Sequence, residues 1–193
     1  MSETVSPQTV RHYWFETLAP KDWYVANDAV DATISKRFKD TWKAAHKGGL
    51  QDWLETAEDL LAYLIVTDQF PRNMFRGDGR SFATDPQARA ATEIALGRGW
   101  DLQTPEPARQ FFYLPLMHAE DLALQDRSVA LFSERMPEAG ADNLDHAKAH
   151  RWVIAAFGRF PYRNAALNRE TTEAEQAFLD NGGYRHALEQ VRG

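Results

Sequence analysis

The chain has 193 residues, of which 44% are hydrophobic and 12% aromatic; this is enough apolar material for one folded domain and excludes intrinsic disorder. Its formal net charge of −6 argues against a general nucleic-acid-binding protein. Cysteine is absent and no apolar run approaches the roughly 20 residues of a membrane span, which excludes disulfides, cysteine nucleophiles and transmembrane helices. We therefore expect a cytoplasmic protein with no membrane and no nucleic-acid partner.

Signals for helix starts recur along the chain, either an N-cap residue, with or without a following proline, or a capping box. They are Ser6-Pro7, Asn27, Thr56 with Asp59, Asp85-Pro86, Thr104-Pro105 and Thr172 with Glu175. We expect Pro71 to end the apolar helix that follows Thr56. A long helix is predicted over 119–136, and Gly182-Gly183 is expected to close the last helix and leave a polar tail over 183–193.

Strand signals are missing, because no segment shows a sustained alternation of apolar and polar residues bounded by hairpin turns. The sequence therefore predicts an all-α protein with about eight to ten helices. Short loops between these helices make successive helices antiparallel neighbours. We expect one domain over 1–193.

Two segments of the chain echo each other. In each, an apolar helix runs into Phe-Pro and then Arg-Asn; they are 64–73, which contains Phe70-Pro71-Arg72-Asn73, and 153–164, which contains Phe160-Pro161-Tyr162-Arg163-Asn164. This similarity predicts an internal duplication of one helical unit.

Four motifs resemble those of the bacterial family DUF924: 68–73, 118–121, 150–164 and 169–170. The similarity extends over nearly the whole chain. It implies an all-helical, TPR-like array of antiparallel hairpins, and it implies no activity, because the function of that family is not established. The sequence departs from the family pattern at Ala119, Leu124, Tyr162 and Asn168, where Ser, Asp, His and Gly are usual.

The first candidate binding group is Asp68, Gln69, Arg72 and Asn73. Asp68 and Arg72 are four residues apart and share a helix face if the helix continues across the proline between them. Arg72 could then bind a carboxylate or phosphate through its planar fork. Alternatively, it pairs with Asp68 or with the second copy and only stabilises the fold.

The second candidate group is His118, Glu120 and Asp121. A histidine beside carboxylates can act as a general acid–base pair, with His118 as the proton-transfer group. Alternatively, the acidic residues serve the first turn of the following long helix, where negative charge is favoured.

The third candidate group is Arg159, Arg163, Asn164 and Arg169, with His150 beside them. Together with Arg72 and Asn73 of the first copy, these side chains could converge on one ligand if a pseudo-twofold axis relates the two copies. These arginines must be balanced by internal carboxylates, for which Asp68, Glu120, Asp121 and Glu170 are the candidates, or by an anionic ligand, and the sequence leaves both open. His146 and His150 have the spacing of two ligands on one helix face. Because no third ligand is evident, we expect no metal and no cofactor.

Three functional interpretations follow. The first is a binding module whose arginines and asparagines hold an anionic small molecule or a peptide. The second is a small enzyme acting on a phosphorylated or carboxylated metabolite, and the third is an internal network of ion pairs with a purely structural role. Exposed aromatic side chains could also form a homodimer contact.

Overall fold

The computed structural model describes residues 4–193, and all regular secondary structure in that range is helical. This confirms the predicted all-α class. No helix in the same range is long and apolar enough to cross a membrane. The chain divides into two compact units, Met1–Thr104 and Pro105–Gly193. The single domain and the TPR-like duplication stay predictions.

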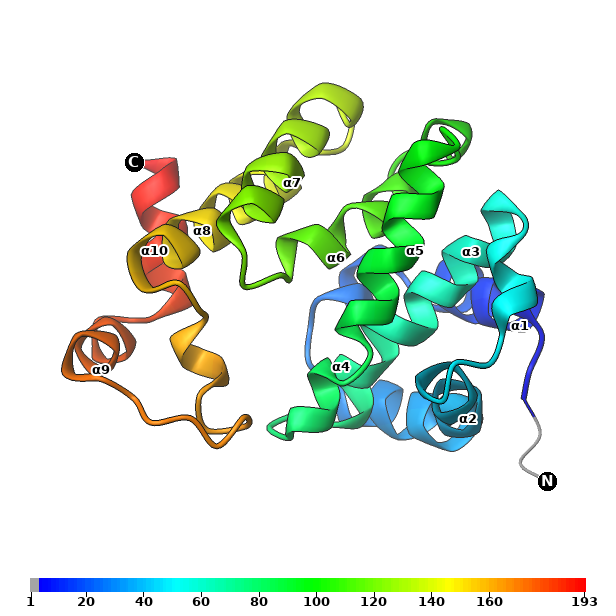
Figure 1. Ribbon diagram of the computed structural model, residues 1–193, viewed down its shortest axis with the longest axis horizontal. Helices are drawn as coiled ribbons and strands as arrows, with labels where there is room; N and C mark the ends of the chain where they lie inside the picture. The colour runs from blue at the N-terminus through cyan, green and yellow to red at the C-terminus, as the bar shows by residue number, and fades with distance from the viewer. Residues whose placement is uncertain (1–3) are drawn as a thin grey trace. The chain divides into compact units, whose positions relative to one another are not determined.

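The α-helices of the first unit pack around an aromatic core. The rings of Phe38 and Phe70 stack with centroids 4.6 Å apart, and Trp14 meets Phe70 edge-on at 5.7 Å. Two single π-helical turns, η1 (His12–Thr17) and η4 (Ile65–Gln69), interrupt the regular helices. In Figure 1 the helices are α1 (Pro7–Arg11), α2 (Asp28–His46), α3 (Ala57–Leu64), α4 (Phe70–Met74) and α5 (Asp85–Gly97).

The predicted starts of α1 and α2 are confirmed. The Ser6 side chain accepts a hydrogen bond from the backbone N–H of Thr9, and Pro7 is the first residue of α1. Asn27 caps α2 by accepting from two backbone N–H groups of the first turn, at 3.0 and 3.3 Å. Both side chains satisfy donors that the first turn of a helix leaves unpaired.

Pro71 does not end the apolar helix, so that prediction is wrong. The helical path continues from α3 through η4 into α4, and Phe70 keeps right-handed helical dihedrals of φ −55° and ψ −37°. Proline has no N–H to donate to the carbonyl four residues earlier. Here that carbonyl belongs to Thr67, and it accepts a hydrogen bond from the Thr84 hydroxyl at 2.6 Å. The proline is therefore accommodated without a buried, unsatisfied acceptor at Thr67.

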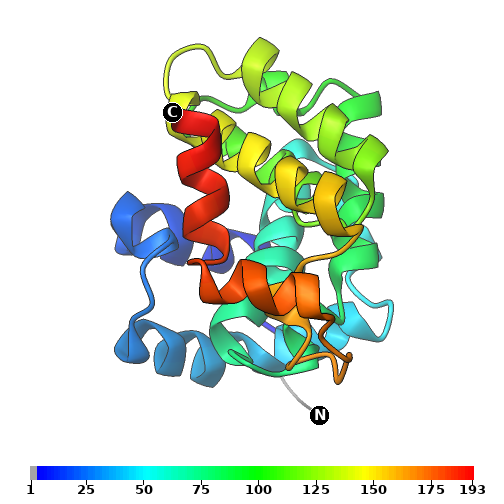
Figure 2. The same cartoon turned by 90° about the vertical axis from the view of Figure 1, so that its left-hand side faces the viewer.

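In the second unit, α7 (Leu122–Arg135) packs along α8 (Ala141–Phe157), and α10 (Tyr184–Arg192) lies across α8 (Figure 2). The core between α8, α9 and α10 consists of buried apolar side chains: Ala149, Val153, Ile154, Phe160, Phe178 and Ala187. The helices of this unit are α6 (Leu114–Met117), α7 (Leu122–Arg135), α8 (Ala141–Phe157), α9 (Glu173–Asp180) and α10 (Tyr184–Arg192), with the 3-10 turns η7 (Ala108–Phe112) and η8 (Pro161–Arg163).

Two further expectations differ from the structure. No helix starts at Thr104-Pro105; the next helical turn, η7, starts at Ala108 after Pro107. The polar tail expected over 183–193 contains α10, whose apolar residues recur at helical spacing and pack against the core of the unit: Tyr184, Ala187, Leu188 and Val191. A short amphipathic helix of this kind is stabilised by packing rather than by its own propensity.

The capping box at the start of α9 is confirmed. The Thr172 hydroxyl accepts from the backbone N–H of Glu175 at 3.3 Å, and the Glu175 carboxylate accepts from the backbone N–H of Thr172 at 2.8 Å. This start also places the Glu175 carboxylate beside Arg159 of the third candidate group.

Candidate functional site

The first candidate group lies at the junction of η4 and α4 and is bonded internally. Arg72 Nη2 donates to the carboxylates of Asp68 at 3.2 Å and Asp85 at 3.0 Å, and its Nη1 donates to the Ser81 carbonyl at 2.5 Å. The Gln69 amide donates to the second oxygen of Asp68 at 2.6 Å. Because the helix continues across the proline, Arg72 reaches Asp68 at helical spacing and also joins α4 to α5.

Asn73 in the same group faces α2. Its amide donates to Asp31 Oδ1 at 2.7 Å, and Arg76 donates to both oxygens of the same carboxylate. The polar side chains around Arg72 and Asn73 therefore join α4 to α2 and α5, which is the arrangement expected of a structural network.

The second candidate group is divided between different partners. The backbone carbonyl of His118 accepts from Arg163 Nη1 at 3.1 Å, and its ring centroid lies 6.1 Å from that of His150. Asp121 is the N-cap of α7, accepting from the backbone N–H three residues further on at 3.0 Å. Glu120 binds an arginine. The carboxylates of Glu120 and Asp121, either of which could have acted with His118, are therefore engaged elsewhere.

Glu120 forms a fork-to-fork ion pair with Arg169. Arg169 Nη1 and Nη2 donate to the two carboxylate oxygens at 2.6 and 2.9 Å, and the backbone N–H of Phe160 donates to Glu120 Oε1 at 2.8 Å. Burial raises the pKa of Glu120, but the bonds from Arg169 and Phe160 outweigh it, so that the pKa lies below its usual value. Arg169 also donates to the Asn164 side chain at 3.0 Å and to the Phe160 carbonyl at 3.1 Å.

Glu175 forms the second ion pair of this unit. Arg159 Nε and Nη2 donate to its two oxygens at 2.6 and 2.8 Å, and the Asn164 amide donates at 3.2 Å. The Glu175 side chain is 4% exposed and that of Arg159 is 30% exposed. The bonds from Arg159, with those from Thr172, lower the pKa of Glu175 to about 2. Arg159 Nη2 also donates to the Glu170 carbonyl at 2.7 Å.

His150 and Arg163 both contact the ring of Phe160. The His150 ring meets Phe160 edge-on at 5.3 Å, and the buried Arg163 guanidinium lies 4.4 Å from the Phe160 ring centroid. His150 Nδ1 donates to the His146 carbonyl at 2.8 Å. Burial, followed by the charge of His118, lowers the pKa of His150 to about 3, so its ring is neutral at pH 7.

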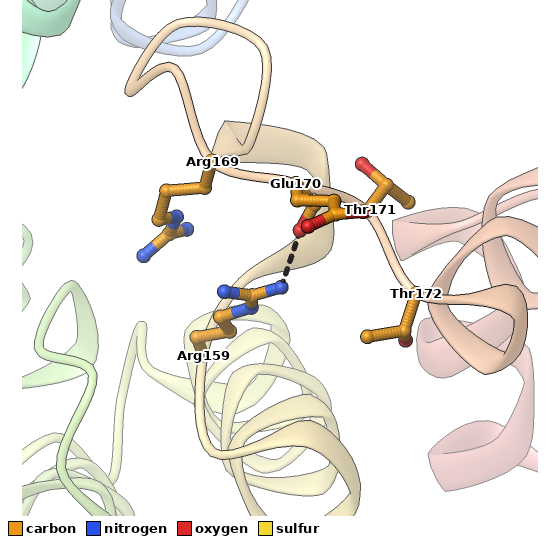
Figure 3. A pocket seen from close by; sticks show the side chains of 5 residues that line it. All are labelled: Arg159, Arg169, Glu170, Thr171 and Thr172. Carbon is orange, nitrogen blue, oxygen red and sulfur yellow. Dashed lines mark hydrogen bonds between the residues drawn. The ribbon is translucent and has the colours of Figure 1, made fainter.

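An open pocket of about 550 Å³ is lined by the arginines of both ion pairs (Figure 3). It is called the Arg159 pocket here, and its lining residues are Arg159, Arg169, Glu170, Thr171 and Thr172. All five belong to the second unit, at the end of α8 and the approach to α9. Figure 3 shows the Arg159 guanidinium reaching the backbone at Glu170.

Both arginines of the Arg159 pocket have N–H groups that make no hydrogen bond within the described residues, and these are called the reserve donors. A guanidinium has five N–H donors. Within residues 4–193, Arg159 bonds through Nε and Nη2 only, which leaves both hydrogens of Nη1. Arg169 bonds once through Nη1, which leaves one hydrogen there. Three N–H donors of the two lining arginines are therefore unused within the described residues, and two threonines complete the polar lining of the pocket.

The two Phe-Pro segments place their arginines and asparagines in different units, each with partners of its own. In both, the asparagine amide donates to a carboxylate, Asn73 to Asp31 and Asn164 to Glu175. The convergence of both copies on one ligand stays a prediction. No group of three or more His, Cys, Asp or Glu side chains in the described range is arranged to hold a metal ion.

Sequence reasoning missed three lining residues of the Arg159 pocket: Glu170, Thr171 and Thr172. It assigned Thr172 and Glu175 to a capping box and named Glu170 only as a counter-charge. The available signal was the position of this capping box, a few residues after Arg169. A helix start next to an arginine group places its capping carboxylate within reach of those arginines.

The comparisons with known proteins agree with the sequence resemblance. A family model described as bacterial protein of unknown function (DUF924) matches residues 10–183. A solved structure of a protein of unknown function from Agrobacterium tumefaciens is 40% identical in sequence. The two structures agree with a TM-score of 0.84 over 91% of this chain and 97% of that one. No curated protein matches the chain.

Proposed function

The chain belongs to the DUF924 family of bacterial proteins of unknown function, and we propose that it is a binding module whose Arg159 pocket holds an anionic small molecule or the acidic end of a peptide. The observation that carries this proposal is the reserve of N–H donors on Arg159 and Arg169, which face a pocket of about 550 Å³. Pockets that bind small ligands typically have volumes of about 300–1,000 Å³.

The ion pairs support this role because they hold the two guanidinium groups in place before a ligand arrives. Arg159 and Arg169 each bond a carboxylate through two nitrogens, so neither side chain must lose much rotamer freedom on binding. The paired carboxylates also cancel most of the positive charge. Binding then depends on hydrogen bonds from Nη1 and the threonine hydroxyls. Because little net positive charge remains, a singly charged carboxylate is favoured over a phosphate dianion.

A binding role is proposed in preference to the enzyme that the sequence also suggested. That alternative needs Glu120 or Asp121 beside the His118 ring, whereas these carboxylates bond Arg169 and the first turn of α7. The cytoplasmic location and the TPR-like repeat belong to this proposal as expectations from composition and family resemblance.

A thermal-shift titration of the purified chain with succinate, inorganic phosphate and a short acidic peptide tests the proposal. A ligand present at 100 times its Kd stabilises the folded state by about 2.7 kcal/mol. We expect succinate or the peptide to raise the melting temperature and Arg159→Lys to abolish the rise. Lysine keeps a positive charge for Glu175 but loses the Nη1 donors.

The matched control is Arg151→Lys. Arg151 lies on α8, bonds Asp126 and does not line the pocket. This variant should respond to ligand as the wild-type chain does. The proposal fails if none of the three ligands changes the melting temperature, or if Arg159→Lys responds as fully as the control.

A further inference from the structure

We propose that the natural ligand of the Arg159 pocket is zwitterionic, with a carboxylate that accepts from Arg159 and Arg169 and an ammonium group that pairs with Glu170. Free amino acids and the termini of short peptides have this chemistry. The inference rests on the proposed function, because it assigns the second charged group of the ligand bound in the same pocket.

The inference is based on the side-chain carboxylate of Glu170. It lines the pocket, and its side-chain carboxylate has no hydrogen bond or ion pair with any residue of the described range. By contrast, Glu120 and Glu175 each accept at least three N–H donors. The backbone of Glu170 is also fixed, because its carbonyl accepts from Arg159 Nη2 at 2.7 Å. Glu170 thus contributes an unpaired carboxylate to the lining of the pocket that Arg159 also lines.

The charges around the pocket favour a zwitterionic ligand over a purely anionic one. The charges of Arg159 and Arg169 are already balanced by Glu175 and Glu120, so a purely anionic ligand would meet the uncompensated charge of Glu170. Like charges at short range repel each other, whereas an ammonium group on the same ligand would pair with Glu170. A ligand that carries both charges therefore matches the Arg159 pocket better than either a simple acid or a phosphate.

The test compares amino acids with the acids that lack only the amino group: glycine with acetate, β-alanine with propionate, and γ-aminobutyrate with butyrate. The full ¹⁵N-labelled chain is titrated at pH 7 and low ionic strength, and the backbone amide signals of Thr171 and Thr172 report occupancy. We expect at least one amino acid to bind up to about fivefold more tightly than its acid, the gain typical of one exposed ion pair. Added salt should reduce this preference.

Glu170→Gln should remove the preference for the amino acid and leave the acid bound as well as before or better. Glu173→Gln is the matched control: Glu173 is an exposed carboxylate in the first turn of α9 that does not line the pocket, and this variant should keep the preference. Because the Glu170 side chain is exposed and unpaired, its variant should melt at the wild-type temperature without ligand.

Equal affinities for amino acid and acid in the wild-type chain would overturn the inference, and so would a preference that survives in Glu170→Gln. In both cases the binding of acids would still depend on Arg159, and the proposed function would stand. If neither class shifts the signals of Thr171 and Thr172, both the proposed function and this inference fail.

Discussion

The ion pair between Arg159 and Glu175 allows a quantitative prediction. The Glu175 carboxylate accepts four hydrogen bonds, two from Arg159 and one each from Asn164 and Thr172. In Glu175→Gln, one oxygen becomes an NH₂ group, which cannot accept from any of these donors. Breaking a fully buried pair costs about 3–5 kcal/mol. Because the Arg159 side chain is 30% exposed, water solvates part of the remaining charge, and we expect a loss of about 2–3 kcal/mol.

This loss should depend on pH. The pKa of Glu175 is lowered from 4.5 to about 2 in the folded protein, so its charge stabilises the fold fully above about pH 4.5. The contribution then decreases as the pH falls towards 2, because the carboxylate becomes protonated in the folded state as well. The difference in stability between the wild-type chain and Glu175→Gln should therefore be largest at pH 7 and at most about half as large at pH 3.

Urea denaturation followed by tryptophan fluorescence measures this difference at both pH values. At pH 7 the melting temperature should also fall by about 5–10 °C for a chain of this length. Asp180→Asn is the control, because Asp180 is an exposed carboxylate of α9 whose one bonded partner among residues 4–193 is Gln176. It should change stability by less than about 0.5 kcal/mol at either pH. An equal loss for Glu175→Gln at pH 7 and pH 3 would refute the assignment to the charged pair.

Two smaller stability effects should also be measurable by urea denaturation at pH 7. Asp121→Ala should cost about 1 kcal/mol, because it removes the cap of α7; a cost near zero would contradict the capping role. Gly158→Ala should cost about 1–2 kcal/mol, because Gly158 ends α8 with a φ of 70° that other residues adopt with strain. Gly97→Ala, in the last turn of α5, lacks that strain and is its control.

Helix starts could be predicted from the sequence because the interactions that fix them are local. Ser6, Asn27 and Thr172 each accept a hydrogen bond from a backbone N–H two or three residues away. The residues that define a helix start are therefore close together in the sequence. The helix over 184–192 was missed for the opposite reason. Its apolar face is short, and its stability depends on α8, whose proximity in space the local sequence does not encode.

The candidate site could be predicted by residue type but not by pairing. Arg159 and Arg169 were recognised as arginines in need of counter-charges, and Glu120 was one of the candidates. The structure pairs Arg169 with Glu120 across 49 residues and Arg159 with Glu175 across 16 residues. Such pairings depend on how helices pack. Only the packed structure therefore shows which donors remain available and that Glu170 remains unpaired.

The two Phe-Pro segments show that the same short motif adopts different local structures. A residue before proline is normally extended, and Phe160 obeys this rule with φ −92° and ψ 106°, following the positive φ of Gly158. Phe70 instead stays helical, because the π-helical turn before it and the Thr84 hydroxyl accommodate Pro71. Helical continuity turns the first arginine back onto its own helix and α5. The break at Gly158 ends α8, so that Arg159 of the second segment leaves the helix and lines a pocket together with Arg169, which follows that segment. The difference between the copies therefore lies in the residues that precede the motif.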